Sequence, residues 1–485
     1  MAAGIGAVGY VAHRRAAARR RAAGDPVSAS TRAARTLEVA RLGTSAATGA
    51  AVHKARRAVA GAEQKVVLDA AFQLRTAEQV AEALGGMKGA LMKLGQMASY
   101  LDQGLPEPVR EALAQLQSDA PPMASALARS TAEQALGRRI EDAFAEWDDV
   151  PMASASIGQV HRAVTHDGRA VAVKVQYPGV GEAIKADLGN AGLIFGAIGM
   201  LFPGLEPGPI VDELRERLVE ELDYRLEASN QRLFAAAYRD HPFIHVPDVV
   251  DELCADVVLT TELAAGARFH EVATTWSQAE RDLAAESIYR FVFGSLYRLL
   301  AFNGDPHPGN YLFSPGGRVT FLDFGLVKHF VPRDVQIMEH MIRAMVIDRD
   351  IPAFRRAIAD AGLLPLSADF PEDEIEAYFG HFYDFVREDR PVTITPEWSS
   401  ESVRRFFDAG SEHGEIMKAA NVPPSFVIIQ RINLGLYAVL GELSATANWR
   451  RIAEELWPWA EGGPSTPLGR AEAEWLERTT KGTNA

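Results

Sequence analysis

The sequence predicts an α+β protein with a bilobal fold, in which a small mixed lobe precedes a larger helical lobe. A helical extension is expected before the lobes and a helical region after them. Apolar residues recur at helical spacing from about residue 64, strand-like runs flank Asp167-Gly168, and helical patterns dominate from Glu280 onward. We find no internal repeat, which argues against a solenoid or a propeller.

The chain has 485 residues, enough for two or three domains, and its 47% hydrophobic content is ordinary for a globular protein. Its single cysteine, Cys254, excludes an internal disulfide and fits a reducing compartment. We expect Cys254 to be a buried, small hydrophobic residue. Composition and periodicity predict five segments: a basic low-complexity leader at 1–60, a helical extension at 61–146, a small lobe at 147–265, a larger lobe at 266–390 and a C-terminal helical region at 391–485.

Positive charge is concentrated at the start of the chain. Residues 1–60 hold eleven Lys or Arg against two acidic residues, a net charge of +9, which leaves −23 for the rest of a chain whose total is −14. The acidic remainder argues against nucleic acid as the main partner. The leader is compatible with a solvated tail, a transit peptide or a segment resting on anionic lipid. It lacks the order of a secretory signal, so we expect a cytoplasmic protein whose membrane contact, if any, is peripheral.

No stretch of the sequence predicts a membrane-spanning helix, because none reaches eighteen uninterrupted apolar residues. Residues 191–203 are broken by Gly and Pro, and we interpret them as a buried helix or an interfacial patch. Residues 426–440 contain Gln430, Arg431 and Asn433. This second stretch therefore predicts a packed amphipathic helix.

The helical extension begins with apolar residues that recur from Val67 to Leu101 at spacings of three, four, and six or seven. That spacing is typical of the buried face of a helix. Two pairs of prolines, at 106 and 108 and at 121 and 122, then break the pattern. A further helix is expected at 132–145.

The small lobe begins where the period shortens toward two. Runs at 156–163 and 170–176 flank the Asp-Gly turn and predict a hairpin. The patterns that follow predict helices at 181–199 and 210–238, short strands at 246–250 and 256–262, a hinge at 263–266, and helices from residue 280 interrupted only at 305–327.

Three oxygen-bearing side chains lie in that interruption. Asp305 is followed five positions later by Asn310, and Asp323-Phe324-Gly325 comes thirteen residues after Asn310, behind an apolar run. Phosphoryl-transfer enzymes with a protein-kinase-like fold use this layout, in which one aspartate lies near the acceptor hydroxyl while an amide and a second carboxylate hold Mg²⁺. The pattern predicts ATP and Mg²⁺ as cofactors.

Lys174 ends the second hairpin strand in Val-Ala-Val-Lys, where a kinase-like fold places the lysine that contacts ATP phosphates. Its partner would be a carboxylate, and Glu221, Asp223 and Glu227 lie on one predicted helix. Glu221 and Glu227 are six residues apart, about 240° around a helix, so this helix could serve two cations. A lone lysine in a strand is usually solvated, and only the downstream aspartates favour the catalytic interpretation.

An alanine-rich loop takes the place of a Gly-x-Gly-x-x-Gly loop. Alanines add Cβ atoms and remove positive-φ freedom, so the backbone cannot wrap phosphates in the same way, and we expect nucleotide to bind in an altered pose. The predicted nucleotide-binding residues are Ala153, Ser154, Ala155, Ser156, Val160, Lys174 and Glu262.

Lys93 and Gln96 form a Lys-x-Gly-Gln motif in the extension and share one helix face at i and i+3. By themselves they are typical of a solvated helix edge. Taken in order with five further motifs, however, they closely resemble the UbiB/AarF family of atypical, protein-kinase-like proteins, whose animal members are the AarF-domain kinases. The further motifs are Ser-Ile-Gly-Gln-Val, Val-Ala-Val-Lys-Val-Gln, Glu-Leu-Asp, Asp-Pro-His-Pro-Gly-Asn and Leu-Asp-Phe-Gly, and the resemblance covers about residues 64–350.

The resemblance implies roles for these residues. The Lys-x-Gly-Gln helix would fold over the active site, which makes Lys93 and Gln96 inhibitory or lipid-handling residues. Lys93 would pair with Glu221 and Asp223. The remaining implied roles are a Lys174–Glu227 bridge, Asp305 as the catalytic aspartate, and Asn310 and Asp323 as Mg²⁺ ligands.

The resemblance also implies an atypical kinase or ATPase that acts on or near isoprenoid lipid or quinone-pathway components. A non-catalytic nucleotide-binding scaffold for lipid or protein partners stays open, because the alanine-rich loop and the covering helix should restrain phosphoryl transfer to a protein. A small-molecule phosphotransferase of the aminoglycoside-kinase kind shares Asp-x-x-x-x-Asn but gives no reason for Lys93 and Gln96. We interpret His307 as a neutral loop histidine in preference to a general base.

Overall fold

The computed structural model describes residues 123–155, 157–182, 220–407, 413–421 and 424–483. The leader, the predicted helix at 181–199 apart from its first two residues, and the predicted site residues Lys93, Gln96 and Ser156 lie outside this part of the chain. The chain divides into two compact units. The N unit comprises Met1–Leu226 and Val249–Leu263, and the C unit comprises Glu227–Asp248 and Ala264–Ala485.

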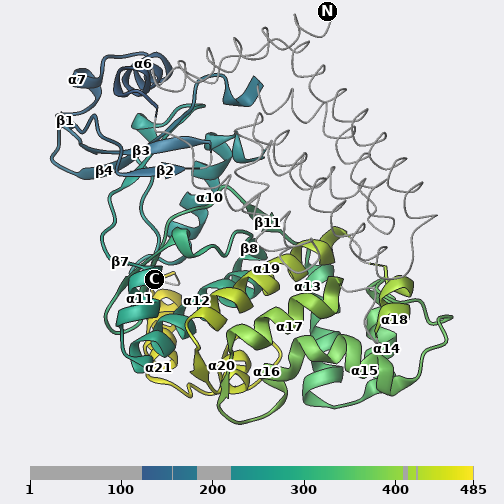
Figure 1. Cartoon of the computed structure of the whole chain (residues 1–485). Helices are drawn as coiled ribbons and strands as arrows, with labels where there is room; N and C mark the ends of the chain where they lie inside the picture. Colours follow the sequence, from purple (N-terminus) through teal and green to yellow (C-terminus); the bar gives the residue numbers. More distant parts are fainter. Residues whose placement is uncertain (1–122, 156, 183–219, 408–412, 422–423, 484–485) are drawn as a thin grey trace, which may run out of the picture. The chain divides into compact units, whose positions relative to one another are not determined.

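An antiparallel sheet forms the centre of the N unit (Figure 1). Its strands run in the order β1-β3-β4-β6, and β2 pairs with β3. The predicted hairpin is confirmed, with Gly168 at φ +88° in its turn, a value that glycine adopts without steric cost. The strand bounds are β1 Glu146–Trp147, β2 Ala153–Ala155, β3 Gly158–Val164, β4 Ala170–Gln176 and β6 Val258–Glu262.

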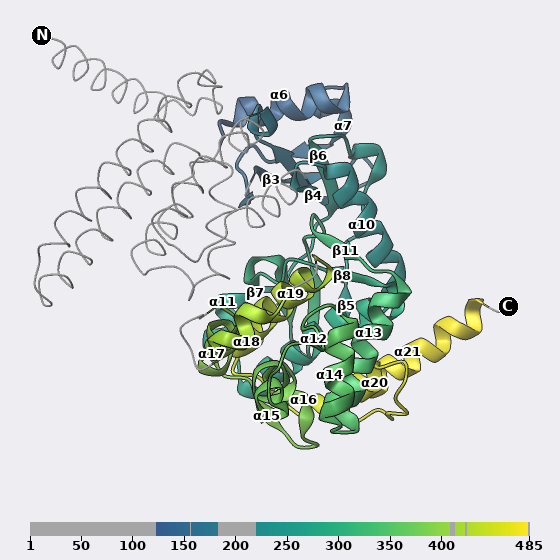
Figure 2. The same ribbon diagram turned by 90° about the vertical axis from the view of Figure 1, so that its right-hand side faces the viewer.

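Helices α6 (Ser125–Leu136) and α7 (Ile140–Ala143) belong to the N unit, and Figure 2 shows α6 beside the sheet. Alanines of α6 share a core with Val171, Val173 and Val175 of β4. The helix predicted at 132–145 was wrong in its bounds, because Gly137 adopts a left-handed φ of +67° and ends α6.

The helix predicted at 210–238 is interrupted. Leu222 and Asp223 leave the helix, and α10 begins afresh at Tyr224 and ends at Ala237. Asp223 Oδ1 accepts hydrogen bonds from the backbone N–H groups of Arg225 (3.1 Å) and Leu226 (2.9 Å), as an N-cap residue does. The expectation that Glu221 and Glu227 occupy two faces of one helix was therefore wrong.

The C unit contains a four-stranded sheet in the order β5-β10-β9-β7, in which β10 pairs parallel to β5 and antiparallel to β9. The strand predicted at 246–250 was misplaced, since β5 ends at His245 and Val249 makes only an isolated bridge. The elements are β5 Ile244–His245, the 3₁₀ turn η1 Asp251–Leu253 of the N unit, β7 Ala267–Arg268, α11 Phe269–Thr275, α12 Gln278–Leu299, β8 Ala301–Asn303, η2 Pro308–Asn310, β9 Tyr311–Ser314, β10 Arg318–Phe321 and β11 Val327–His329.

Helices form the remainder of the C unit (Figure 1). Together with the buried face of α12 they form one large apolar core. The elements are α13 Pro332–Ile342, the π turn η3 Arg343–Ile347, α14 Ile351–Asp360, α15 Glu372–Phe379, η4 Gly380–Tyr383, α16 Asp384–Arg387, β12 Val392–Thr393, α17 Pro396–Phe407, α18 Gly414–Ala419, α19 Pro424–Glu442, β13 Thr446–Ala447, α20 Trp449–Leu456 and α21 Pro467–Thr483.

Helix α19 contains the apolar stretch predicted at 426–440. Ile432, Leu436 and Leu440 of this helix are fully buried in the core, so the prediction of a packed helix is confirmed. Among the helices that the structure describes, none combines the length and the hydropathy needed to cross a bilayer.

A buried charged cluster joins α12 to the last two helices. The guanidinium of Arg290, only 1% exposed, contacts Glu286 (2.7 Å), Glu455 of α20 (2.7 Å) and Glu472 of α21 (2.9 Å). Arg298 adds a second contact to Glu472 at 2.6 Å. Burial of a guanidinium is costly unless carboxylates surround it, and this cluster therefore specifies where α20 and α21 dock.

Candidate active site

The loop after β8 carries the first two predicted site residues. Asn310 Nδ2 donates to the Asp305 backbone carbonyl at 3.0 Å and to its carboxylate Oδ2 at 3.2 Å. The amide nitrogen of Asn310 therefore faces Asp305, and its amide oxygen is the atom left for a cation or another donor. The loop holds the Asp305 carboxylate in one orientation.

Asp323 lies directly beyond the end of β10. The pairing of β9 with β10 sets Tyr311 opposite Phe321, and the N–H of Leu322 donates to the carbonyl of Asn310 at 3.0 Å. Asn310 and Asp323 thus occupy the same end of one strand pair. Asp323 Oδ1 also accepts from the Gly325 N–H at 3.0 Å, which orients the carboxylate.

Asn303 connects the two halves of this arrangement, and the sequence patterns did not single it out. Its Nδ2 donates to the backbone carbonyl of Asp323 at 2.8 Å, and its Oδ1 accepts from the backbone N–H of Asp305 at 3.3 Å. The residue is 9% exposed. The one signal in the sequence was the position of Asn303, at the end of β8 and two residues before Asp305. That signal could not predict the bridge, because the bridge also needs the contact with Asp323, twenty residues away.

Glu227 belongs to the same unit and lies beside the Asp-Phe-Gly turn. A Cβ added to Gly325 would lie 3.3 Å from Asp323 Oδ1 and 3.7 Å from Glu227 Oε2, so two carboxylates flank this glycine. Glu227 is 2% exposed. Asn230, one turn further along α10, donates to the Phe324 carbonyl at 3.1 Å. The structure therefore brings Glu227, Asp305, Asn310 and Asp323 into one region of the C unit.

Three of the predicted nucleotide-binding residues, Ala153, Val160 and Lys174, share one face of the sheet in the N unit. The strand register sets Ala153 opposite Val160, and Val160 opposite Lys174. Residues directly opposite one another in a sheet point to the same side. Val173 and Val175 point to the other side, into the core, so Lys174 and its neighbours occupy the face away from that core.

Tyr224 adds an aromatic ring to this face, and the sequence patterns did not identify it either. The Lys174 ammonium lies 5.0 Å from the centroid of the Tyr224 ring, within the range of a cation–π contact. A Cβ on Gly158 would lie 3.0 Å from the Tyr224 hydroxyl and 2.4 Å from the Val175 carbonyl. Only glycine fits at position 158, and the ring of Tyr224 covers the strand there.

Some predicted site residues do not point to this sheet face, and two predicted ion pairs stay untested. The register sets Glu262 opposite Val171, so its side chain points to the sheet face away from Lys174, and a nucleotide contact there would need the backbone. Asp223 caps α10, as described above. Lys174 and Glu227 fall in different units, and Lys93 lies outside the described residues, so both predicted ion pairs stay predictions.

The donor set fits one magnesium ion. The described residues hold no group of three or more His, Cys, Asp and Glu side chains that could bind a metal by themselves. Mg²⁺ commonly takes one or two protein oxygens and completes its shell with phosphate oxygens and water. The amide oxygen of Asn310 and the carboxylate of Asp323 are suitable for that role.

Two histidines near catalytic-looking partners have structural roles. His307 Nδ1 accepts from the Gly309 N–H at 3.1 Å, which favours a neutral loop residue. His381 lies between Asp384 (2.9 Å) and Ser402 (2.9 Å), as in a hydrolase triad. Ser402 is fully buried and its Oγ donates to the Trp398 carbonyl at 3.0 Å, so no substrate can reach it. We interpret this second group as a core hydrogen-bond network.

Cys254 is half-buried, which differs from the expected full burial. Its sulfur donates to the Val250 carbonyl at 3.3 Å and accepts from the Thr260 N–H at 3.3 Å. The thiol therefore forms weak hydrogen bonds with the backbone in addition to packing.

The fold and this site define a protein of the kinase-like class. Residues 115–357 match the family described as the ABC1 atypical kinase-like domain, and the chain belongs to that family. The α+β fold class and the resemblance to UbiB/AarF proteins are thereby confirmed.

The chain is 36% identical over 257 residues to the rat mitochondrial atypical kinase COQ8B, covering 52% of this chain and 48% of that protein. It is 32% identical over 320 residues to mouse AarF domain-containing protein kinase 1, covering 64% and 60%. The chain thus spans about half the length of these curated relatives. A solved complex of Rv3197 with erythromycin from Mycobacterium tuberculosis matches with a TM-score of 0.59 at 33% identity, over 82% of this chain and 99% of that one.

We expect replacement of Asn303 by leucine to lower kcat for ATP hydrolysis by up to roughly 10²-fold, with little change in KM, because the bridge positions Asp305 and Asp323. Steady-state kinetics would measure this. Asn421→Leu, at an exposed asparagine of the same unit, is the control and should leave kcat unchanged. A rise in KM at constant kcat would contradict the positioning role.

Proposed function

We propose that the protein is a Mg²⁺-dependent atypical kinase or ATPase that binds ATP. The observation that carries this proposal is the joint placement of Asp305, Asn310 and Asp323, bridged by Asn303, in one unit. Phosphoryl transfer needs little covalent chemistry from a protein, so positioning and electrostatics supply most of the catalysis. An oriented aspartate beside two oxygen ligands meets that requirement.

The roles proposed for the residues follow from their chemistry. Asn310 and Asp323 would hold Mg²⁺, which when bound neutralises charge on the ATP phosphates. Asp305 would orient the attacking hydroxyl or water and accept its proton. Lys174 would contact the phosphates, and its cation–π contact with Tyr224 restricts where its ammonium can lie.

The substrate class proposed is an isoprenoid lipid or a quinone precursor, with the protein in the cytoplasm and its membrane contact peripheral. Its support is the resemblance to UbiB/AarF proteins. Ala153 and Ala155 occupy an extended strand with no positive φ, so this hairpin does not supply the backbone cradle that a Gly-rich loop would form. That difference supports ATP hydrolysis or transfer to a small acceptor over transfer to a protein.

The test is Mg²⁺-dependent ATP turnover by purified wild-type protein and by Asp305→Asn. This change keeps an acceptor for the Asn310 amide but removes the base, and we expect kcat to fall by about 10²-fold or more while ATP binding persists. Unchanged turnover would reject Asp305 as the catalytic residue. ATP binding without turnover in the wild type would favour the nucleotide-binding scaffold.

A second candidate function is macrolide binding. Its support is the match to a solved chain whose complex contains erythromycin, at 33% identity and over 99% of that chain. Calorimetric titration with erythromycin, in the presence and absence of Mg-ATP, tests it. Saturable one-to-one binding would support this function, and absence of heat at millimolar macrolide would reject it.

A further inference from the structure

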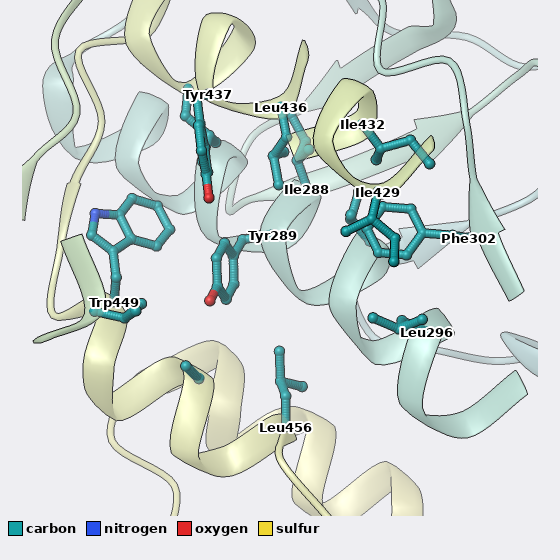
Figure 3. Close-up of a cluster of buried hydrophobic side chains, with 14 of the residues drawn as sticks. Ile288, Tyr289, Leu296, Phe302, Ile429, Ile432, Leu436, Tyr437, Trp449 and Leu456 are labelled. Carbon is teal, nitrogen blue, oxygen red and sulfur yellow. The ribbon is translucent and has the colours of Figure 1, made fainter. Parts of the chain in front are cut away.

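A cavity of about 90 Å³ lies within the C unit. Its walls come from α12, β8, α13, η4 and α19, and they include Tyr289, Leu296, Phe302, Met341 and Phe382. Figure 3 shows the apolar side chains of α12 and α19 facing one another across this part of the core. The cavity is therefore built by segments that are far apart in the sequence.

The size of the cavity limits its occupant. A single water needs roughly 10–15 Å³, and a dry engineered cavity of about 150 Å³ binds benzene. Pockets for drug-sized ligands measure about 300–1,000 Å³, so neither a nucleotide nor a macrolide fits here. In proportion to benzene, which has six non-hydrogen atoms, the space suits an apolar molecule of roughly four.

Asn433 is the exception in an otherwise aromatic and aliphatic wall. Its amide oxygen is buried and has no hydrogen-bond partner among the described residues. Nearby Tyr437 already donates its hydroxyl to the Phe382 carbonyl at 3.2 Å. A buried acceptor without a donor lowers stability, and a ligand that donates to it would recover that loss.

The described residues of the wall carry no charge at physiological pH. Burial raises the pKa of the hydroxyls of Tyr289, Tyr297 and Tyr383, so these residues stay neutral. No Lys, Arg, Asp or Glu lines the cavity among the described residues. A charged ligand would find no counter-charge there, which excludes carboxylates, phosphates and amines.

We propose that this cavity binds a small uncharged alcohol, with its apolar body against the aromatic wall and its hydroxyl donating to the amide of Asn433. This binding site is independent of the proposed phosphotransfer. Its test therefore requires no ATP and does not depend on catalytic activity.

The probes are 2-propanol and acetone, which each have four non-hydrogen atoms but differ in having a hydroxyl donor. Methionine methyl NMR on the whole chain reports binding, because Met338 and Met341 line the cavity whereas Met152 lies in the N unit. Of these three methyl groups, we expect those of Met338 and Met341 to show saturable shifts and that of Met152 to show none. We also expect 2-propanol to bind about fivefold more tightly than acetone, as one net hydrogen bond predicts.

Two variants decide the role of the amide. Asn433→Leu should abolish the preference for the alcohol, whereas Asn421→Leu should retain it. If Asn433→Leu does not fold, Met341→Phe is the alternative variant, because the larger side chain fills the cavity. It should weaken the binding of both probes equally, with the Met338 methyl as the reporter. Absence of saturable shifts in the wild type, or equal affinity for the two probes, would overturn the proposal.

Discussion

Replacing Asp323 by asparagine is expected to reduce kcat for ATP hydrolysis by roughly 10²–10³-fold, the scale of losing one preorganised electrostatic contact. The substitution preserves an oxygen that can accept from the Gly325 N–H, so the Asp-Phe-Gly turn should persist. What is lost is the negative charge that we propose holds Mg²⁺. Turnover measured against Mg²⁺ concentration would therefore show both a lower maximum and a weaker apparent metal affinity.

The matched control is Asp369→Asn, at an exposed aspartate in the same unit. It should leave both the maximum and the Mg²⁺ dependence unchanged. If Asp323→Asn retained wild-type turnover at saturating Mg²⁺, the assignment of Asp323 as a metal ligand would be wrong. A thermal unfolding curve for each variant separates loss of chemistry from loss of fold.

Replacing Arg290 by methionine is expected to lower the free energy of unfolding by about 3–5 kcal/mol, because removal of one partner leaves buried carboxylates without a counter-charge. Three carboxylates converge on this guanidinium, from Glu286, Glu455 and Glu472. Chemical denaturation monitored by tryptophan fluorescence would measure the change, since Trp475 lies on α21 and Trp449 on α20.

Arg451→Met is the control for Arg290→Met, because Arg451 is exposed and pairs with an exposed Asp389. Surface pairs contribute little, so its denaturation midpoint should match the wild type. Equal midpoints for Arg290→Met and Arg451→Met would show that the buried cluster does not stabilise the C unit.

The same cluster predicts a pH dependence. Burial by itself would raise the pKa of Glu472, but the neighbouring imidazole of His241 and the guanidinium groups of Arg298 and Arg290 outweigh it and lower the pKa to about 2. The stabilisation from Glu472 is therefore complete above its ordinary value of 4.5 and is lost as the pH falls toward 2. Wild-type protein and Glu472→Gln should differ most in unfolding midpoint above pH 4.5, and the difference should shrink as the pH falls toward 2.

The order of the motifs along the chain was sufficient to predict the kinase-like fold and the hairpin that contains Lys174. These features depend on local patterns: alternating apolar residues, an Asp-Gly turn, and the spacing from Asp305 to Asn310. Residues that are close in the sequence also contact one another in the folded chain, as Asn310 does when it donates two hydrogen bonds to Asp305. Local spacing is therefore enough to predict such contacts.

Errors arose where the choice between helix and turn depended on one side chain. The patterns predicted a continuous helix through Glu221 and Glu227, but Asp223 caps a new helix, because its carboxylate satisfies two N–H groups that a continuing helix would bond internally. The helix near residue 132 ended early for a similar local reason, the left-handed conformation of Gly137.

Residues that act across long sequence separations were beyond reach of any local pattern. Asn303 joins Asp305 to Asp323, Tyr224 lies against Lys174, and Arg290 gathers carboxylates from two later helices. Each contact exists only after strands pair and helices pack, because burial is what makes a polar side chain require a specific partner. The residues proposed for the site were thus identifiable from residue types and spacing, whereas the side chains that position them were selected by packing.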